Sequence, residues 1–331
     1  MSVHPKIAVL GGGSWATAIV KMLSENLDTI GWYMRSEYAV EHIKRNKHNP
    51  SYLSSAELHP EQLDLSADIN ATVKNYDVLI FAIPSAFLKS ELDKLTESLE
   101  GKIIFSAIKG IVPETGYIVG EHFSETYKIP FENIGVITGP CHAEEVAMER
   151  LSYLTIACQD QEKAKKVGDC LKGRYIRTKI SDDIIGTGYA AMLKNIYAIA
   201  AGIYHGLGYG DNFQSVLMSN SIREMKRFIR KVHKMKRNIN NSAYLGDLLV
   251  TGYSTFSRNR MFGNMIGKGY TVKSAMFEMS MVAEGYYATK SAYIINQDKG
   301  ARTPIIDAVY SVLYDGKEAK IVFDKLTYKL N

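Results

Sequence analysis

The chain has 331 residues, which is enough for about two domains of ordinary size. Hydrophobic residues make up 46% and charged residues 23% of the chain, so the composition excludes disordered, collagen-like and disulfide-rich proteins. The formal net charge of +5 is small for this length, so it does not call for nucleic acid or a membrane surface as partner, and it suits a small anionic substrate.

The start of the chain and its cysteines indicate the compartment. The first apolar run, residues 7–10, ends in glycines and is too short for the core of a signal peptide. No stretch reaches the roughly 18 uninterrupted apolar residues of a membrane span. Cys141, Cys158 and Cys170 lack CxxC spacing, which argues against a disulfide framework and a zinc site. We therefore expect a cytoplasmic protein without a metal or an integral membrane segment.

Short β-rich runs alternate with helical segments in the first half of the chain, which is typical of a parallel sheet with helices on both faces. We expect nearly continuous apolar strands at residues 6–10, 29–34, 77–83, 102–107, 133–138 and 154–158. After about Ser181, long helical stretches follow at residues 184–206, 214–233 and 271–293. The pattern predicts an α/β fold: a doubly wound sheet over residues 1–182 and an all-helical domain over residues 183–331.

The motif GGGSWATA, residues 11–18, directly follows the first predicted strand and matches GxGxxA through Gly11, Gly13 and Ala16. Glycine allows a sharp turn and a close approach of backbone to a pyrophosphate, whose charge then lies at the N-terminus of the next helix. The strand before the motif and the helix after it support a Rossmann-like domain that binds NAD or NADP. Arg35, after the second strand, can pair with the 2′-phosphate of NADP or lie at the surface. Glu37 is close enough in the sequence that NAD is also possible as the cofactor.

A single formally charged residue, Lys194, lies within residues 184–210. The apolar residues around it would cover nearly every side of a helix, so we expect a buried ammonium. One alternative is a lysine that reaches the surface or forms a structural ion pair. The chemical interpretation is a general acid that protonates a developing alkoxide, with a pKa lowered by burial and by another cation.

A second polar cluster lies within LGDLLVTGYSTFSRNRMFG, residues 245–263. Asp247 lies among apolar residues, and the run Ser257, Arg258, Asn259 and Arg260 offers donors suited to phosphate. Taken alone, this run could be an ordinary exposed loop. Together with a nucleotide-binding half and a buried lysine, it predicts a phosphorylated substrate.

These residues resemble the NAD(P)-dependent glycerol-3-phosphate dehydrogenases of the bacterial type. The resemblance runs from Lys6 to at least Ala292, through motifs in this order: GGGSWATA, the pair Lys109 and Gly110, GPCHAEEVA (139–147), LKNIYAIAAGIYHGLGYGDN (193–212), LGDLLVT with SRNR, and VAEGYYATK (282–290). It implies reversible reduction of dihydroxyacetone phosphate to sn-glycerol 3-phosphate with NADH or NADPH, supplying glycerophospholipid synthesis. It also implies a homodimer.

The resemblance assigns a role to each matched position. Lys194 is the catalytic general acid, Lys109 contacts substrate and cofactor, and Asp247 binds substrate and orients Lys194. Asn195 would help to hold the hydroxyls. The remaining substrate contacts are Gly139, Cys141, Ser257, Arg258 and Asn259. The cofactor contacts are Gly11, Gly13, Ser14, Trp15, Ala16, Arg35, Lys109, Ala143, Arg258, Val282 and Glu284.

Three features depart from the family's pattern. Ala16 replaces a glycine, Cys141 and His142 replace the usual Ser and Phe, and the second strand is followed by one arginine instead of two. The sequence therefore leaves the preference between NAD and NADP open.

Two alternative functions remain. A related two-domain reductase, of the ketopantoate or β-hydroxyacid type, would combine the same folds with a lysine. A nucleotide-sensing or nucleic-acid-binding protein would use the basic run of residues 223–237. We interpret that run as a solvated helix face, since it carries no RNA-binding motif and the net charge is small.

Overall fold

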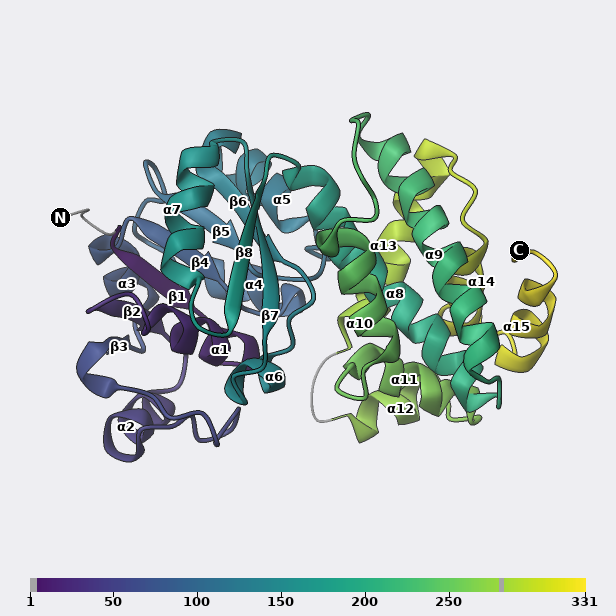
Figure 1. Cartoon of the computed structure of the whole chain (residues 1–331), viewed down its shortest axis with the longest axis horizontal. Coiled ribbons are helices and arrows are strands. Elements are labelled where there is room, and N and C mark those ends of the chain that lie inside the picture. Colours follow the sequence, from purple (N-terminus) through teal and green to yellow (C-terminus); the bar gives the residue numbers. More distant parts are fainter. Residues whose placement is uncertain (1–4, 280–282) are drawn as a thin grey trace. The chain divides into compact units, whose positions relative to one another are not determined.

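The computed structural model describes residues 5–279 and 283–331. The chain forms two compact units (Figure 1). Unit 1 comprises Met1–Ile108 and Val119–Ile184, and unit 2 comprises Lys109–Ile118 and Ile185–Asn331. The sequence pattern suggests one boundary after residue 182 and gives no sign that Lys109–Ile118 leaves the first unit for the second.

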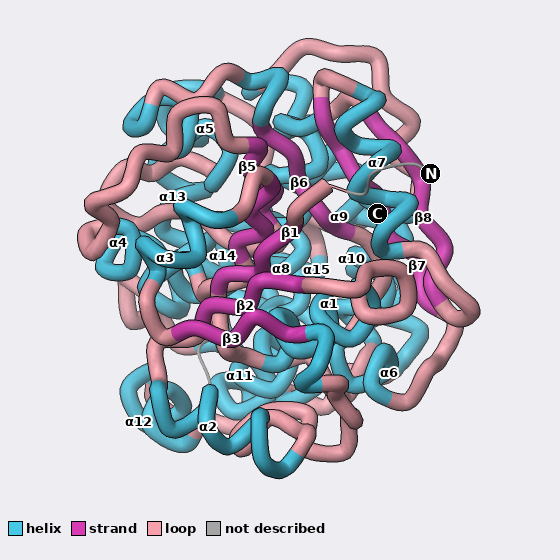
Figure 2. The backbone as a smooth tube through the Cα atoms, turned by 90° about the vertical axis from the view of Figure 1, so that its left-hand side faces the viewer, coloured by secondary structure: helices cyan, strands magenta, loops and turns pink. Residues whose placement is uncertain are grey.

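Unit 1 is built on one eight-stranded sheet, visible as the magenta strands in Figure 2. Its strand order is β3-β2-β1-β4-β5-β6-β7-β8. The strands are β1 (Ile7–Leu10), β2 (Ile30–Tyr33), β3 (Leu63–Ser66), β4 (Val78–Phe81), β5 (Ile103–Ser106), β6 (Ile134–Thr138), β7 (Ser152–Cys158) and β8 (Ile176–Ser181). Because the order reverses between β1 and β4, the carboxyl ends of these two strands form a switch point, where ligands bind in such sheets.

The sheet is parallel, as expected, except at one pair of strands. Strands β6 and β7 are antiparallel, whereas the other pairs are parallel. Two parallel strands need a crossover connection between them, which is usually a full helix. The connection between β6 and β7 contains only the five-residue helix α6 (Ala143–Ala147), so these strands pair antiparallel. The edge strands β3 and β8 were not predicted, since both are only partly buried and lack a continuous apolar run.

Helices cover both faces of this sheet. Val9 of β1 and Ile80 of β4 belong to the core beneath α1 (Ser14–Leu23) and α7 (Gln161–Leu171). On the opposite face, Phe81 contacts Phe123 of α5 (Val119–Tyr127), with ring centroids 4.8 Å apart. The other helices of unit 1 are α2 (Glu37–Asn46), α3 (Ile69–Asn75) and α4 (Ser85–Leu92), with 3₁₀ turns at Pro60–Gln62 and Phe131–Asn133.

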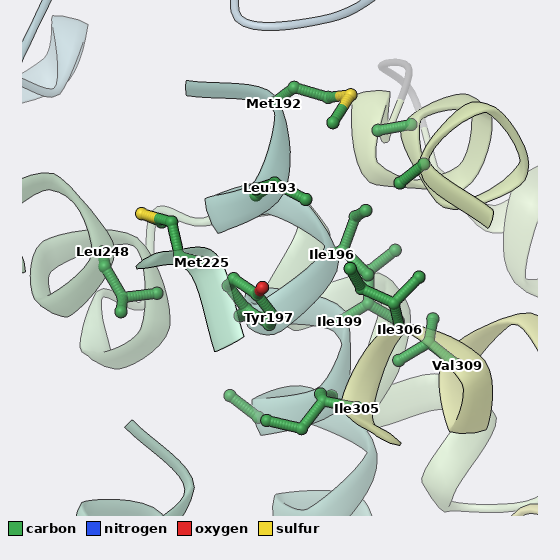
Figure 3. Close-up of a cluster of buried hydrophobic side chains, with 14 of the residues drawn as sticks. Met192, Leu193, Ile196, Tyr197, Ile199, Met225, Leu248, Ile305, Ile306 and Val309 are labelled. Carbon is green, nitrogen blue, oxygen red and sulfur yellow. The ribbon is translucent and has the colours of Figure 1, made fainter. Parts of the chain in front are cut away.

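Unit 2 is helical and is organised around α8 (Ile184–Gly206), whose predicted bounds are confirmed. Figure 3 shows its apolar side chains meeting Met225 of α9 (Asp211–Val232), Leu248 of α10 (Asp247–Tyr253) and Val309 of α14 (Pro304–Leu313). The remaining helices are α11 (Arg258–Gly267), α12 (Val272–Glu278), α13 (Glu284–Lys299) and α15 (Ala319–Thr327). The single helix expected over residues 271–293 is thus wrong, because α12 ends at Glu278 and α13 begins at Glu284.

Helices α8 and α11 approach each other so closely that their contact requires glycine. A Cβ atom at Gly202 of α8 would collide with the carbonyl oxygen of Arg260, and one at Gly263 of α11 with that of Ile199. Gly206 and Gly267 repeat this arrangement one turn further along. Backbone therefore packs on backbone, which fixes α11 relative to the helix that carries Lys194.

The basic run 223–237 lies partly on α9, and its Lys226, Arg230, Lys231, Lys234 and Lys236 are exposed. Its opposite face is buried through Met225, Phe228 and Ile229. Within the described residues, no helix is both long enough and apolar enough to span a bilayer.

Candidate functional site

The glycine-rich turn between β1 and α1 has the conformation that the motif predicts. Gly11 has φ +133°, and a Cβ atom on it would lie 2.6 Å from the carbonyl oxygen of Ala82, at the end of β4. Gly13, the residue before α1, would place a Cβ atom in open space, with no atom within 4 Å. The turn therefore presents bare backbone and a helix N-terminus at the switch point, which fits the diphosphate of a dinucleotide.

The other predicted cofactor and substrate residues of unit 1 lie near the carboxyl ends of its strands. Ser14, Trp15 and Ala16 form the first turn of α1. Arg35 follows β2 and is exposed. Gly139, with φ +121°, follows β6, and a Cβ atom there would lie 2.6 Å from the carbonyl oxygen of Tyr153. Cys141 is buried on the same turn, and Ala143 begins α6. Val282 lies outside the described residues.

Lys194 is buried, as the sequence predicts, and unit 2 brings it together with two other predicted residues. Its side chain is 4% exposed, and Nζ donates a hydrogen bond to Oδ1 of Asp247, whose side chain is 1% exposed. Burial lowers the pKa of Lys194 to about 7; the carboxylate of Asp247 opposes this shift, and the nearby ammonium of Lys109 adds to it. The prediction that burial and a second cation lower this pKa is confirmed in direction.

Local structure on both sides of this pair sets its geometry. A π-helical turn, Ser242–Gly246, runs directly into α10, so Asp247 is its first α-helical residue. Thr251 Oγ1 donates to the carbonyl oxygen of Asp247 at 2.6 Å. Asn195, expected to hold substrate hydroxyls, donates from Nδ2 to the carbonyl oxygen of Lys109 at 2.6 Å and so anchors the segment that carries the second lysine. The π-turn was missed, because a one-residue change of helical pitch leaves no periodic signal.

The predicted phosphate-binding residues form the N-terminus of α11. Ser257 is its N-cap, with Oγ accepting from the N–H of Arg260 at 3.3 Å, and Arg258 is the first helical residue. Asn259 accepts at Oδ1 from the N–H of Gly285, 2.8 Å away, next to Glu284 at the start of α13. A Cβ atom at Gly285 would also lie 2.7 Å from the carbonyl oxygen of Asn195. This end of α11 thus lies beside the residue that follows Lys194.

The arrangement in unit 2 combines two chemical capacities. A lysine with a pKa near 7 can give or take a proton near neutral pH. A helix N-terminus that carries an arginine suits a dianion such as phosphate. The described residues contain no group of three or more His, Cys, Asp or Glu side chains that could hold a metal ion.

Sequence reasoning missed three buried polar side chains in unit 1, Thr17, Trp32 and Asn49, which contact the carbonyl groups of the glycine-rich turn. Trp32 and Asn49 lie far along the chain from that turn. No local pattern therefore marks them.

Family models match both halves of the chain. Residues 6–164 match the NAD-dependent glycerol-3-phosphate dehydrogenase N-terminus, and residues 183–324 match the C-terminus of the same family. A protein of Lysinibacillus sphaericus named glycerol-3-phosphate dehydrogenase [NAD(P)+] is 36% identical over 330 residues, which cover 98% of this chain and 96% of that protein.

Solved structures of related proteins share this fold. The glycerol-3-phosphate dehydrogenase of Coxiella burnetii is 26% identical, with a TM-score of 0.88 over 98% of this chain and 99% of that one. A putative 2-dehydropantoate 2-reductase of Enterococcus faecalis has a TM-score of 0.53 at 14% identity, over 96% of this chain and 99% of that one. This second likeness is one of fold alone, so the alternative of a ketopantoate-type reductase is the weaker one.

Proposed function

Because the chain belongs to the NAD-dependent glycerol-3-phosphate dehydrogenase family, we propose that it interconverts dihydroxyacetone phosphate and sn-glycerol 3-phosphate. The observation that carries the chemistry is Lys194, a buried lysine with a pKa near 7 that is hydrogen-bonded to Asp247. The residues that would hold the cofactor, NAD or NADP, are those of the glycine-rich turn, 11–16, with Arg35 and Ala143. When bound, the reduced nicotinamide supplies the hydride to the carbonyl carbon.

Lys194 supplies the proton in the reducing direction. As charge develops on the carbonyl oxygen, the ammonium donates a proton to it, and in the reverse direction the neutral amine removes that proton from the hydroxyl. Asp247 orients Nζ, and its carboxylate raises the pKa of the lysine against the effect of burial. Lys109 polarises the carbonyl as its negative charge grows.

The N-terminus of α11 holds the phosphate of the substrate. Arg258 contributes a guanidinium with several donors, and the helix dipole favours a dianion at this end. Ser257 and Asn259 fix this terminus through the cap and through the contact with Gly285. Glu284, at the start of α13, lies beside the same contact and would face the nicotinamide end of the cofactor.

Further parts of the proposal follow from family membership. The product supplies glycerophospholipid synthesis, and the enzyme acts in the cytoplasm as a homodimer. The main partner is a small phosphorylated substrate and not nucleic acid.

The test is oxidation of NADH and NADPH, followed by absorbance, by purified protein with dihydroxyacetone phosphate. We expect rapid substrate-dependent oxidation, and the ratio of the two rates reports what Arg35 contributes. Lys194→Ala should lose most turnover, by about 10²–10⁴-fold, and still bind the reduced cofactor. Lys226→Ala, which removes an exposed lysine of α9, serves as the control and should retain full turnover. Near-normal turnover in Lys194→Ala would refute the general-acid role.

A further inference from the structure

Three consecutive carbonyl groups of the glycine-rich turn each accept a hydrogen bond from a side chain. Trp32 Nε1 donates to the carbonyl oxygen of Gly11 at 2.7 Å, and Asn49 Nδ2 donates to that of Gly12 at 3.0 Å. Thr17 Oγ1 donates to that of Gly13 at 3.0 Å. The carbonyl groups of Gly11, Gly12 and Gly13 are therefore hydrogen-bonded to side chains in the interior of unit 1.

The three donors form one connected and buried network. Trp32 and Thr17 are fully buried, and Asn49 is 2% exposed. Asn49 Nδ2 also donates to Thr17 Oγ1 at 2.9 Å, and its Oδ1 accepts from the N–H groups at positions 51 and 52, at 3.0 and 3.1 Å. The Asn49 amide thus has both donor hydrogens and its acceptor oxygen engaged, which leaves this side chain little freedom to rotate.

The orientation of these carbonyl groups fixes the opposite side of the turn. In a trans peptide the C=O of one residue and the N–H of the next point in opposite directions, and the described chain contains no cis bond. The N–H groups of Gly12, Gly13 and Ser14 therefore point away from the Trp32–Asn49–Thr17 network. Within residues 5–279 and 283–331, no backbone carbonyl group accepts a hydrogen bond from these three N–H groups.

We propose that Asn49, together with Trp32 and Thr17, is a positioning residue of the cofactor site that aims three backbone N–H groups at the diphosphate of the dinucleotide. The inference rests on the proposed function, because it assumes that the turn binds such a diphosphate. An anion held by neutral N–H groups depends on their direction, since hydrogen bonds weaken steeply with angle. The side chains act through the backbone and do not touch the ligand themselves.

The experiment changes the three side chains of the network one at a time in the full-length chain. Thr17→Val keeps the shape of the side chain and removes a hydroxyl that donates to Gly13 and accepts from Asn49. Trp32→Phe removes the Nε1 donor together with part of a buried ring system, and Asn49→Ala removes the centre of the network. Tyr76→Phe is the matched control, because it removes a part-buried hydrogen bond of 3.0 Å to Asp64 in the same unit, and neither residue belongs to the network. For each variant, binding of NADH, of ADP-ribose and of adenosine is measured by fluorescence titration or competition, alongside kcat at saturating cofactor and the melting temperature.

We expect Asn49→Ala to weaken NADH and ADP-ribose by about tenfold, and Trp32→Phe and Thr17→Val to weaken them by roughly threefold or more. Adenosine, which has no phosphate, should bind all variants equally, and kcat at saturating cofactor should stay within about twofold, since the chemical step is not touched. Tyr76→Phe should change only the melting temperature.

Two results would overturn the inference, and they separate it from the proposed function. If the wild-type protein binds NADH and ADP-ribose but the network variants bind them as Tyr76→Phe does, the positioning role is wrong and the proposed function stands. If the variants lose adenosine as strongly as ADP-ribose, the network supports the whole domain and not the diphosphate site. A wild-type protein that binds neither NADH nor NADPH would refute the proposed function and this inference together. Should Asn49→Ala fail to fold, Trp32→Phe and Thr17→Val decide the outcome.

Discussion

Lys194 occupies a site in which opposing influences act on its pKa. Burial and the Lys109 ammonium lower the pKa, the Asp247 carboxylate raises it, and the result is about 7. A lysine in water would stay charged to above pH 10 and would be a poor base for the reverse reaction. In the proposed reaction, one group would therefore serve both directions of a reversible oxidation near neutral pH.

This balance predicts opposite pH shifts for two substitutions. Reduction needs protonated Lys194, so its rate should be fully developed below pH 7 and lost as the pH rises through about 7. Asp247→Asn removes the group that raises the pKa, so the midpoint should move to lower pH. Lys109→Met removes a cation that lowers the pKa, so the midpoint should move to higher pH. The pH dependence of kcat for the residual activity of each variant measures both shifts. A common direction, or no shift in either, would contradict the role of this pair.

Arg258 gives a second prediction at this scale. Because its proposed partner is the phosphate, which does not react, Arg258→Ala should raise the KM for dihydroxyacetone phosphate by at least about tenfold. Steady-state kinetics with varied substrate at saturating cofactor provide the measurement. Activity toward unphosphorylated dihydroxyacetone should be affected much less, and an unchanged KM for the phosphorylated substrate would reject the assignment.

At the scale of helices, the crossing of α8 and α11 connects the proposed proton donor to the proposed phosphate-binding end of the site. Gly202 and Gly206 on α8 face Gly263 and Gly267 on α11 with backbone against backbone. Lys194 lies on the first of these helices, and the N-terminus of the second begins with Arg258. A shift of α11 along α8 would therefore move the arginine relative to the lysine.

We expect Gly263→Ala to lower the free energy of unfolding by about 3 kcal/mol, because the added methyl group meets the carbonyl oxygen of Ile199, which cannot move without bending α8. Urea-induced unfolding followed by circular dichroism measures the loss. Gly210→Ala is the control, since a Cβ atom there meets no atom within 4 Å, and it should cost less than about 1 kcal/mol. Equal stability of the two variants would show that the crossing tolerates a methyl group.

The sequence pattern predicted elements that depend on local interactions. It missed those that depend on contacts between residues far apart in the sequence. Lys194 is recognisable because a single charge in a long apolar helix is a local signal, and α8 was predicted with its bounds. Strand β3 was missed because none of its residues is fully buried at the edge of the sheet and because it depends on β2 for its pairing. Asn49 was missed because its partners lie 32 and 37 residues away.

At the scale of the molecule, the assignment of Lys109–Ile118 to unit 2 is the least expected feature. The segment follows β5 and precedes α5, both of unit 1, yet Ile111 and Ile118 belong to the core around α8. Ile111 and Ile118 also pair with each other through an antiparallel bridge. Lys109, a residue of the proposed site, thus reaches unit 2 from the middle of the sequence of unit 1.

This assignment predicts which unit loses stability when a cavity is made at Ile111. Ile111→Ala should destabilise unit 2, by about 2–5 kcal/mol, although its neighbours along the chain belong to unit 1. Hydrogen exchange read by mass spectrometry should show faster exchange in peptides of α8 and α14, with the sheet strands unchanged. Ile104→Ala, at a fully buried position of β5, should give the reverse pattern. Faster exchange confined to the sheet after Ile111→Ala would contradict the assignment.

The same segment has a consequence for synthesis on the ribosome. Residues 109–118 leave the exit tunnel well before α8, so Ile111 and Ile118 lack the core partners of unit 2 while the rest of unit 1 is translated. At the roughly 5–20 residues per second of translation, this interval is on the order of ten seconds. During that time the two apolar side chains wait for the helix that buries them, so this segment reaches its native packing only after unit 1 has been synthesised.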